Sequence, residues 1–421
     1  MRVRDDETGQ VLVVFVLCLA VLIGFTALAI DVGHLLYTKR QLQTLADSAA
    51  LAAAIEGKQC GSSPNCTAMQ IAAKVAVTEN GQPTPSLLTQ CSGTVGTDLT
   101  LELNNGPCAM GVSDPNQGST KYVEAVVFKR QNTFFGSLLG ISGVTLSARS
   151  EAALGPSQFC VHVIDPSASQ ALLMNGSSSM SASCGVMVDS SSNTALLANG
   201  NATLSATVVD VHGQDLLNGN PSITPSPQLN SPRQADPLAG TPAPTVGSCT
   251  YNNLTVNGNS TQTLSPGVYC GGLNVNGGAT VRFNSGMYIL SGNTRINGNA
   301  TISGTNVTFY IPTGQFAMNG AAHADLTAPT SGTYAGILFY QNKNDSSQFI
   351  LNGDSTSKWQ GAIYLPGAQL LLNGGSNLAA YTILDVATLT VNGNNTFTIN
   401  SDYSSLPDGS PAQGSTAYLM E

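Results

Sequence analysis

Residues 254–259 read Leu-Thr-Val-Asn-Gly-Asn, and the same pattern returns as Leu-Asn-Val-Asn-Gly-Gly at 273–278, Leu-Leu-Leu-Asn-Gly-Gly at 370–375 and Leu-Thr-Val-Asn-Gly-Asn at 389–394. Each copy is a short apolar run followed by an Asn-Gly pair. The runs are rich in strand-forming residues, and no convincing helical pattern separates them, so they predict β-strands. The repeated pattern therefore indicates a repetitive all-β domain.

The Asn-Gly pair recurs along the chain from about residue 158. Its asparagines are Asn175, Asn199, Asn218, Asn257, Asn276, Asn297, Asn319, Asn352, Asn373 and Asn392. Successive separations, by subtraction, are 24, 19, 39, 19, 21, 22, 33, 21 and 19 residues. Most lie near 20, 39 is close to two periods, and 33 predicts an insertion. A nearly fixed period of this size is the sequence signature of a solenoid.

This period favours a right-handed parallel β-helix, with one coil per period. Asn and Gly both tolerate positive φ, so the pair suits a corner. Because equivalent corners stack, we expect a ladder of side-chain hydrogen bonds through Asn257, Asn276, Asn297, Asn373 and Asn392. Asn-Gly also marks ordinary β-hairpins, but hairpins give no reason for one constant period. The Pro-rich segment 221–248 is expected to run over the outside of the solenoid.

Near the N-terminus, residues 11–30 read Val-Leu-Val-Val-Phe-Val-Leu-Cys-Leu-Ala-Val-Leu-Ile-Gly-Phe-Thr-Ala-Leu-Ala-Ile, without a charge. As a helix this stretch is about 30 Å long, which matches the hydrocarbon core of a bilayer. It therefore predicts one transmembrane helix. Two alternatives concern processing. Ala27-Leu28-Ala29 resembles a signal-peptidase site, although the apolar run is long for a signal peptide. Gly9-Gln10 resembles the cleavage point of a pilin leader, but Val14 stands where pilins usually carry Glu.

The cysteines indicate on which side of the membrane the bulk of the chain lies. The basic residues that flank the apolar stretch, two on each side, leave the orientation undecided. Eight cysteines follow the stretch without C-x-x-C spacing, a usage that suits an oxidising compartment. Cys249 and Cys270 could bond adjacent coils, as could Cys160 and Cys184, although the sequence cannot prove pairings. The candidate disulfide cysteines are Cys60, Cys66, Cys91, Cys108, Cys160, Cys184, Cys249 and Cys270.

Beyond the membrane, residues 31–55 predict a continued helix with one apolar stripe. The stripe comprises Leu35, Leu42, Leu45, Ala49 and Ala52. Two interpretations remain open for this face. It packs on the protein's own domain, or it contacts a helix of another membrane-anchored subunit.

The segment that follows predicts a small α+β unit. A second helix is expected at 68–80, a short helix at 133–139, and strands at 98–103, 121–130 and 144–152. In the first strand Leu99, Leu101 and Leu103 are expected to face one way, with Asp98, Thr100 and Glu102 facing the other; Asn104-Asn105-Gly106-Pro107 should end it. Cys60–Cys66 and Cys91–Cys108 would close local loops in this unit.

Several landmarks resemble the N-terminal region of the TadE/TadG-like proteins. They are Thr8-Gly9-Gln10, the apolar helix, Ala29-Ile30-Asp31-Val32-Gly33, Leu42-Gln43 and the run Ala46-Asp47-Ser48-Ala49-Ala50-Leu51-Ala52-Ala53-Ala54. A weaker resemblance to the periplasmic part of the same family extends to about residue 152. The family belongs to the Tad (Flp) pilus-assembly machinery. The resemblance implies a single-pass protein of the inner (cytoplasmic) membrane, with its bulk facing the periplasm or cell exterior and with other pilus-assembly or pseudopilin-like subunits as partners.

We therefore expect five segments. They are a cytoplasmic N-terminus (1–10), the transmembrane helix (11–30), an extracytoplasmic α+β unit (31–155), the β-helix (156–403) and a C-terminal tail (404–421).

The chain offers little that points to catalysis. No Glu occurs between Ala152 and Met420, and the aspartates are scattered, apart from Asp189 and Asp210, which could stack. Glycosidases need paired carboxylates, so we expect a non-enzymatic protein without a metal or cofactor. The net charge of −9 argues against a nucleic-acid partner. Two other classes remain as alternatives, an envelope adhesin with a carbohydrate-binding solenoid face and, with less support, a polysaccharide-active enzyme.

Overall fold

The computed structural model describes residues 8–57, 60, 66–88, 91–92, 98–108, 114–352, 354, 356–373, 379–394, 396–407 and 409–420. Most of the predicted cytoplasmic segment, 1–7, lies outside the described residues. The chain divides into two compact units. Unit 1 comprises 1–155 together with 416–421, and unit 2 comprises 156–415. The chain therefore passes between the units twice, and the solenoid is inserted into unit 1.

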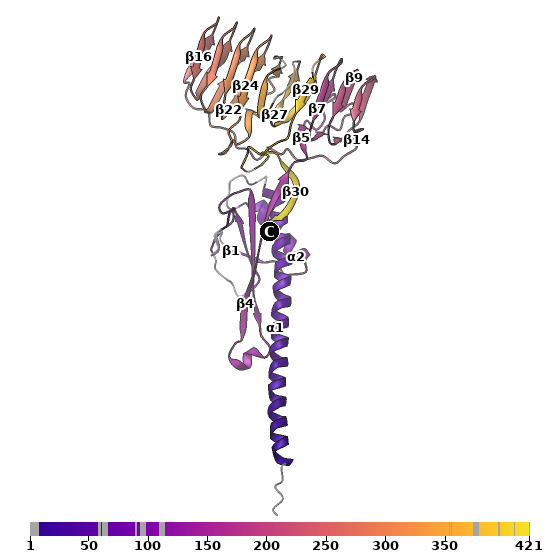
Figure 1. The fold of residues 1–421 in the computed structure, drawn as a ribbon, viewed down its shortest axis with the longest axis vertical. Helices are drawn as coiled ribbons and strands as arrows, with labels where there is room; N and C mark the ends of the chain where they lie inside the picture. Colours follow the sequence, from indigo (N-terminus) through magenta and orange to yellow (C-terminus); the bar gives the residue numbers. More distant parts are fainter. Residues whose placement is uncertain are drawn as a thin grey trace, which may run out of the picture. The chain divides into compact units, whose positions relative to one another are not determined.

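Unit 1 combines a long helix with a five-stranded sheet (Figure 1). The two predicted helical segments form one continuous helix, α1 (Thr8–Glu56), and α2 (Thr67–Glu79) packs on it. The strand order in the sheet is β1-β2-β3-β4-β30. Its elements are β1 (Ser86–Leu88), β2 (Thr100–Asn105), β3 (Tyr122–Asn132), the 3-10 turn η2 (Gly136–Leu139), β4 (Gly143–Pro156) and β30 (Gln413–Met420).

The C-terminal tail differs from its prediction. Residues 413–420 form β30, the strand next to β4 in the sheet of unit 1. The segment is short and carries no clear alternation, so its sequence gave no strand signal. Because β4 leads into the solenoid and β30 follows it, neighbouring strands of one sheet hold both ends of the insertion.

The first predicted strand of unit 1 is shifted, and its two faces are not what alternation suggested. β2 includes Asn104 and Asn105, which were expected to end it, and all six of its residues are buried. Glu102 and Asn104 are fully buried because they bond to other polar side chains inside the unit. Both faces of β2 are therefore buried because one of them carries a buried polar network, which the alternation of apolar and polar residues does not reveal.

Unit 2 is a large parallel β-solenoid, as the repeat predicted. Its coils have three sides, and equivalent strands of successive coils pair in parallel. The side that follows each Asn-Gly corner comprises β16 (Thr261–Leu264), β18 (Thr280–Phe283), β21 (Thr301–Gly304), β24 (His323–Thr327), the start of β27 (Lys358–Leu372), β29 (Thr396–Ile399), β7 (Ser179–Ala182), β10 (Thr203–Ser205) and β13 (Ser222–Thr224).

The other two sides precede the corner, and several strands bend to contribute to both. The second side comprises β15 (Tyr251–Val256), β17 (Gly267–Val275), β19 (Gly286–Ser291), β22 (Val307–Thr313), β25 (Ile337–Gln341), the middle of β27, β28 (Thr382–Val391), β5 (Phe159–Val163), β8 (Gly185–Val188), β11 (Val209–Val211) and β14 (Gln228–Leu229). The third comprises the ends of β15, β17, β27 and β28 with β20 (Thr294–Ile296), β23 (Phe316–Met318), β26 (Phe349–Leu351), β6 (Leu172–Met174), β9 (Leu196–Gly200) and β12 (Asp215–Gly219).

A ladder of asparagine side chains runs along one corner. Each Nδ2 donates to the Oδ1 of the asparagine in the neighbouring coil, with N···O distances of 2.7–3.1 Å. The rungs follow the order Asn257, Asn276, Asn297, Asn319, Asn352, Asn373, Asn392, Asn175, Asn199 and Asn218. At the corners whose glycine the structure describes, the glycine has positive φ, for example 74° at Gly277 and 76° at Gly298, and none of the ladder asparagines does.

The order of the rungs shows that coils are not stacked in chain order. Asn392, from the end of the repeat, bonds to Asn175, from its beginning. Asn218 and Asn257 therefore lie at opposite ends of the ladder, and their separation of 39 residues is not two periods. Figure 1 accordingly shows β16 near one end of the solenoid and β14 near the other, with β5 and β29 between them.

The chain returns from one end of the solenoid to the other through the Pro-rich segment. The first residues predicted for this excursion, 221–229, still form β13 and β14, so the excursion runs from 230 to 250. It lies on the outside of the second side. Tyr364, Tyr340 and Tyr334 donate from their hydroxyl groups to Asp236 Oδ2, Thr241 O and Pro242 O, at 2.8, 3.1 and 3.1 Å. Leu238, on the excursion, is buried against the core of the coils.

Both ends of the inserted solenoid consequently lie in neighbouring coils. β5 begins the solenoid and pairs with β28, one of its last strands. The backbone N–H of Ser157 donates to the carbonyl of Ala412 at 3.0 Å. A solenoid stacked in chain order would place its two ends at opposite ends of the stack. The crossing excursion brings them together, as insertion between neighbouring strands requires.

An internal rung of the ladder is expected to contribute more than a terminal one. Asn297→Ala removes a donor to Asn276 and an acceptor from Asn319, whereas Asn218→Ala removes only the donor to Asn199. At about 1 kcal/mol per hydrogen bond, the internal change should lower the unfolding free energy of the solenoid by about 2 kcal/mol and the terminal change by about half of that. Denaturant unfolding of the full chain in detergent measures both. Equal losses at the two positions would contradict the ladder.

A buried carboxyl group under the excursion makes stability depend on pH. Burial raises the pKa of Asp385 well above its usual value, and the neighbouring carboxylates of Asp236 and Asp189 raise it further. The folded state therefore binds a proton that the unfolded chain releases near its ordinary pKa of about 4. Stability is highest below that pH and falls as the pH rises toward the raised pKa.

The temperature of the thermal unfolding midpoint of the solenoid should accordingly decrease as the pH is raised from mildly acidic to neutral. Asp385→Asn should flatten this dependence, because an amide does not titrate. Asp325→Asn is the matched control, since Asp325 is exposed on β24. If Asp385→Asn kept the same pH slope as the wild type, the buried carboxyl group would not be its cause.

Candidate functional site

The N-terminal half of α1 is an apolar helix that packs on nothing in the described structure. The large apolar side chains from Leu12 to Ile30 are 45–67% exposed. α1 is the one described helix that is long and apolar enough to cross a membrane. The prediction of an apolar membrane helix is confirmed to this extent, and α1 is compatible with a single-pass anchor.

The predicted contact stripe lies mainly against the protein's own sheet. Leu42, Leu45 and Ala49 are buried in the core of unit 1, together with side chains of α2, β2 and β3. Leu35 and Ala52 are half-buried. The stripe therefore packs on its own domain, and three of its five members are unavailable to another subunit.

One face of α2 also exposes apolar side chains. They are Ile71 and Val75, which are four residues apart on the helix. These side chains are 58% and 46% exposed. We call this set the α2 face. The sequence did not indicate this face, because only the tertiary packing reveals which side of α2 is covered.

Asp31 joins α1 to the turn between β3 and β4. Its Oδ1 accepts a hydrogen bond from the backbone N–H of Phe134 at 2.8 Å, and its Oδ2 accepts from Phe135 and Gly136 at 3.0 and 2.6 Å. Asp31 is only 5% exposed. The Phe134 ring also lies 5.3 Å from the His34 ring, one helical turn further along α1. This polar landmark therefore fixes the turn against the helix.

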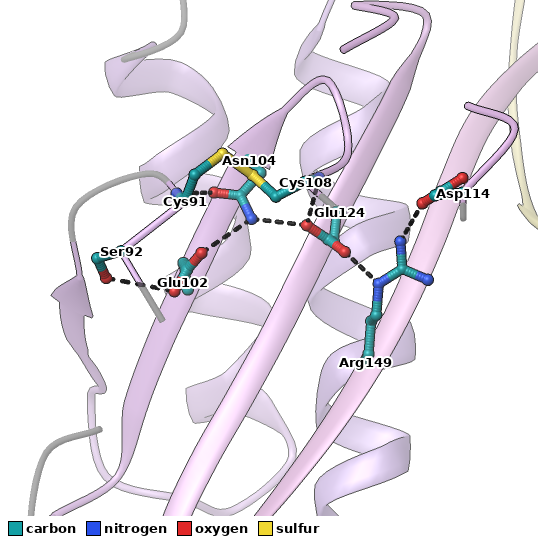
Figure 2. Close-up of a disulfide and its surroundings, with 8 residues drawn as sticks. All are labelled: Cys91, Ser92, Glu102, Asn104, Cys108, Asp114, Glu124 and Arg149. Carbon is teal, nitrogen blue, oxygen red and sulfur yellow. Dashed lines mark hydrogen bonds and ion pairs between the residues drawn. A yellow bond between two sulfur atoms is a disulfide. The ribbon is translucent and has the colours of Figure 1, made fainter. Parts of the chain in front are cut away.

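A polar network holds the Cys91–Cys108 disulfide to the sheet (Figure 2). Asn104 is its centre: Oδ1 accepts from the backbone N–H of Cys91 at 3.0 Å, while Nδ2 donates to Glu102 and Glu124 at 3.1 and 2.7 Å. Glu124 also accepts from the backbone N–H of Cys108 at 3.0 Å. Glu102 and Glu124 are fully buried, so water cannot replace a hydrogen bond that they lose. The network therefore stabilises the unit only while every member stays bonded.

Arg149 provides the positive charge for this network. Its guanidinium donates to Glu124, Asp114 and Glu151. Burial raises the pKa of Glu151, and its hydrogen bond with Asp114 raises it further. The same hydrogen bond lowers the pKa of Asp114. Glu151 therefore holds a proton more readily than Asp114.

The three carboxylates around Arg149 also have metal-ligand spacing, which the sequence did not predict. One oxygen from each of Asp114, Glu124 and Glu151 lies within 4.8 Å of the others. Arg149 bonds to all three of them, so a positive charge already stands where a cation would bind. We therefore interpret the group as an ion-pair network of the fold.

The acidic residues of the solenoid are arranged differently from the prediction. Asp210 pairs in register with Met187, so Asp189 and Asp210 do not stack. Instead Asp189 accepts from the backbone N–H of Gln234 at 3.0 Å, on the excursion that also carries Asp236. Asp189 and Asp385 of the coils thus lie close to Asp236 of the excursion, rather than being scattered. Asp189 and Asp385 are buried, and the group binds the excursion to the coils.

The exposed surface of the solenoid is poor in large apolar groups. Among its described residues, those with exposed large apolar side chains are Leu216, Leu217 and Val246. None of the three is aromatic, and most aromatic side chains of the coils are buried in the core. The described part of unit 2 therefore gives no specific support for an aromatic sugar-binding platform.

All eight candidate disulfide cysteines are bonded. Cys60–Cys66 and Cys91–Cys108 close loops in unit 1. Cys160–Cys184 and Cys249–Cys270 each join neighbouring coils of the solenoid. Cys18, in the apolar half of α1, is free. The prediction of a disulfide-bonded chain is confirmed.

These features define a class of protein in which one apolar helix continues into a disulfide-bonded α+β unit that carries an inserted β-solenoid. Residues 9–56, which coincide with nearly all of α1, match the family described as Putative Flp pilus-assembly TadE/G-like. The resemblance inferred from the sequence landmarks is confirmed over this segment. Comparisons with curated proteins and with solved structures found no match.

The ion pair between Arg149 and Glu124 is expected to be strongly coupled. Arg149→Met should destabilise unit 1 by about 3–5 kcal/mol, because it leaves buried Glu124 without its counter-charge. Adding Glu124→Gln should recover much of the loss, since the uncompensated charge is removed. A double-mutant cycle of unfolding free energies measures the coupling. Additive losses in the two single variants would contradict it.

Proposed function

We propose that the protein is a non-enzymatic, membrane-anchored component of a Tad/Flp-type pilus-assembly or secretion apparatus, with the solenoid as its extracytoplasmic scaffold or binding surface. The observation that carries the proposal is that the family match and the apolar helix fall on the same element, α1. The first half of this helix is exposed and apolar, and the second half is the core helix of unit 1.

The proposed location is the inner membrane, with both units on the periplasmic or outer side. Four disulfides support an oxidising compartment for the residues after the apolar stretch. The α2 face supports a contact with another subunit, because it remains exposed beside the helix that matches the family. Buried carboxylates bind segments of the fold together in both units, which supports a structural rather than a catalytic role.

Deletion and complementation in a host with a Tad/Flp apparatus test this proposal. Deletion should abolish pili or secretion through the apparatus, and the full chain should restore them. Leu22→Arg should fail to restore them, because a charge at the centre of the apolar helix costs about 2.5–3.5 kcal/mol on insertion scales. Val246→Arg is the matched control on an exposed apolar residue of the excursion and should restore function.

Piliation and secretion that both survive deletion would contradict the proposal. Full complementation by Leu22→Arg, with the variant released from the membrane fraction, would contradict the anchoring role.

A further inference from the structure

The turn between β3 and β4 exposes a cluster of large apolar side chains. Phe134, Phe135, Leu138, Leu139 and Ile141 are 62%, 41%, 83%, 81% and 54% exposed. Five such side chains within eight residues form an exposed apolar surface, which in soluble proteins marks an interaction site. We call these five residues the apolar turn.

The backbone of the apolar turn has a defined conformation. Backbone N–H groups of Leu138, Gly140 and Ile141 donate within the turn, to Phe135, Ser137 and Gly136, at 3.0, 3.2 and 3.0 Å. Gly140 has φ of 85°, which favours glycine. Asp31 holds the start of the turn by its three hydrogen bonds. The apolar side chains are therefore presented on a fixed backbone.

The position of Asp31 determines what can cover this surface. Asp31 directly follows the apolar stretch 11–30, and its side chain bonds the turn, so the turn lies beside the end of that stretch. If residues 11–30 span a bilayer of about 30 Å, the turn lies where hydrocarbon meets headgroups. A helix side chain leans toward the helix N-terminus, which here is the membrane side.

The charges around the turn fit the same position. Lys39, Arg40 and Arg130 are exposed, and Lys129 is half-buried. Lys39 also donates to the carbonyl of Ser147 on β4. Apart from Asp31, whose side chain bonds to the turn, no carboxylate occurs in 31–46 or 129–147. Apolar side chains bordered by basic ones are typical of segments that lie in an anionic lipid interface.

We infer that the apolar turn inserts into the lipid interface on the same side as unit 1, as a second membrane contact beside the helix. This inference rests on the anchoring proposed above. Two contacts joined by Asp31 fix the rotation of α1 about its axis. They therefore set which way the α2 face and the sheet of unit 1 are presented along the membrane.

Fluorescence quenching by brominated lipids tests the contact in the full chain. The protein is reconstituted in vesicles of phosphatidylcholine and phosphatidylglycerol whose acyl chains carry no bromine, bromine near the headgroups (to reach the turn) or bromine near the chain ends (to reach the centre of the helix). Leu138→Trp reports on the turn and Leu22→Trp on the helix. The native Trp359 is 2% exposed within the solenoid and gives the unquenched background. Because Leu138 is 83% exposed, the substitution leaves the fold intact.

We expect bromine to remove most of the added fluorescence of Leu138→Trp and to quench Leu22→Trp. Quenching of Leu22→Trp alone would overturn the inference and leave the anchor in place, and would point to a protein partner for the turn. Quenching of neither would overturn both the inference and the anchor. Quenching of Leu138→Trp alone would support the lipid contact and contradict the transmembrane anchor.

The role of Asp31 as a positioning residue has its own control. Asp31→Ala in the Leu138→Trp background should weaken the quenching, because the turn is no longer held beside the helix. Asp47→Ala is the matched variant on α1, where Asp47 accepts a hydrogen bond from Gln43 of the same helix. It should leave the quenching unchanged. Equal quenching in the Asp31 and Asp47 variants would overturn the positioning role.

Discussion

The asparagine ladder is the interaction on which the architecture of unit 2 depends. An asparagine amide has both a donor and an acceptor, so each rung can bond to the coil on either side. At the described corners the glycine that follows takes the positive φ, which turns the chain at the same point in each of these coils. The ladder continues from Asn392 to Asn175, where the neighbouring coils are distant in sequence. Register at the corner is thus independent of chain order.

That independence allows the solenoid to be an insertion. Its first strand, β5, pairs with β28, one of its last strands, inside the stack. The excursion crosses over the coils and connects the two ends of the stack. Unit 1 can therefore keep its own sheet, with β4 and β30 as neighbours, while it carries a large appended domain. The family match lies on α1 alone. We interpret unit 1 as the anchored part of the protein and unit 2 as the part that it presents outside the membrane.

The sequence predicted features that repeat or that are local. The period near twenty residues predicted the coils, and the uncharged stretch 11–30 predicted the apolar helix. The stacking order of the coils could not be predicted, because rungs such as Asn175 and Asn392 are chemically identical. The sequence at a rung does not specify which coil lies next to it. Asp31 was visible as a landmark, but its partners lie more than a hundred residues away. Likewise Arg149 and Glu124 meet only through the pairing of β3 and β4.

Cysteine cross-linking between rungs tests the stacking order most directly. Neighbouring parallel strands are about 4.8 Å apart, within the range that a disulfide spans. We expect Asn175→Cys with Asn392→Cys to form a disulfide under mild oxidation, identified by mass spectrometry of the joined peptides. We expect none for Asn218→Cys with Asn257→Cys, although these residues are far closer in sequence. A cross-link in the second pair and none in the first would contradict this stacking order.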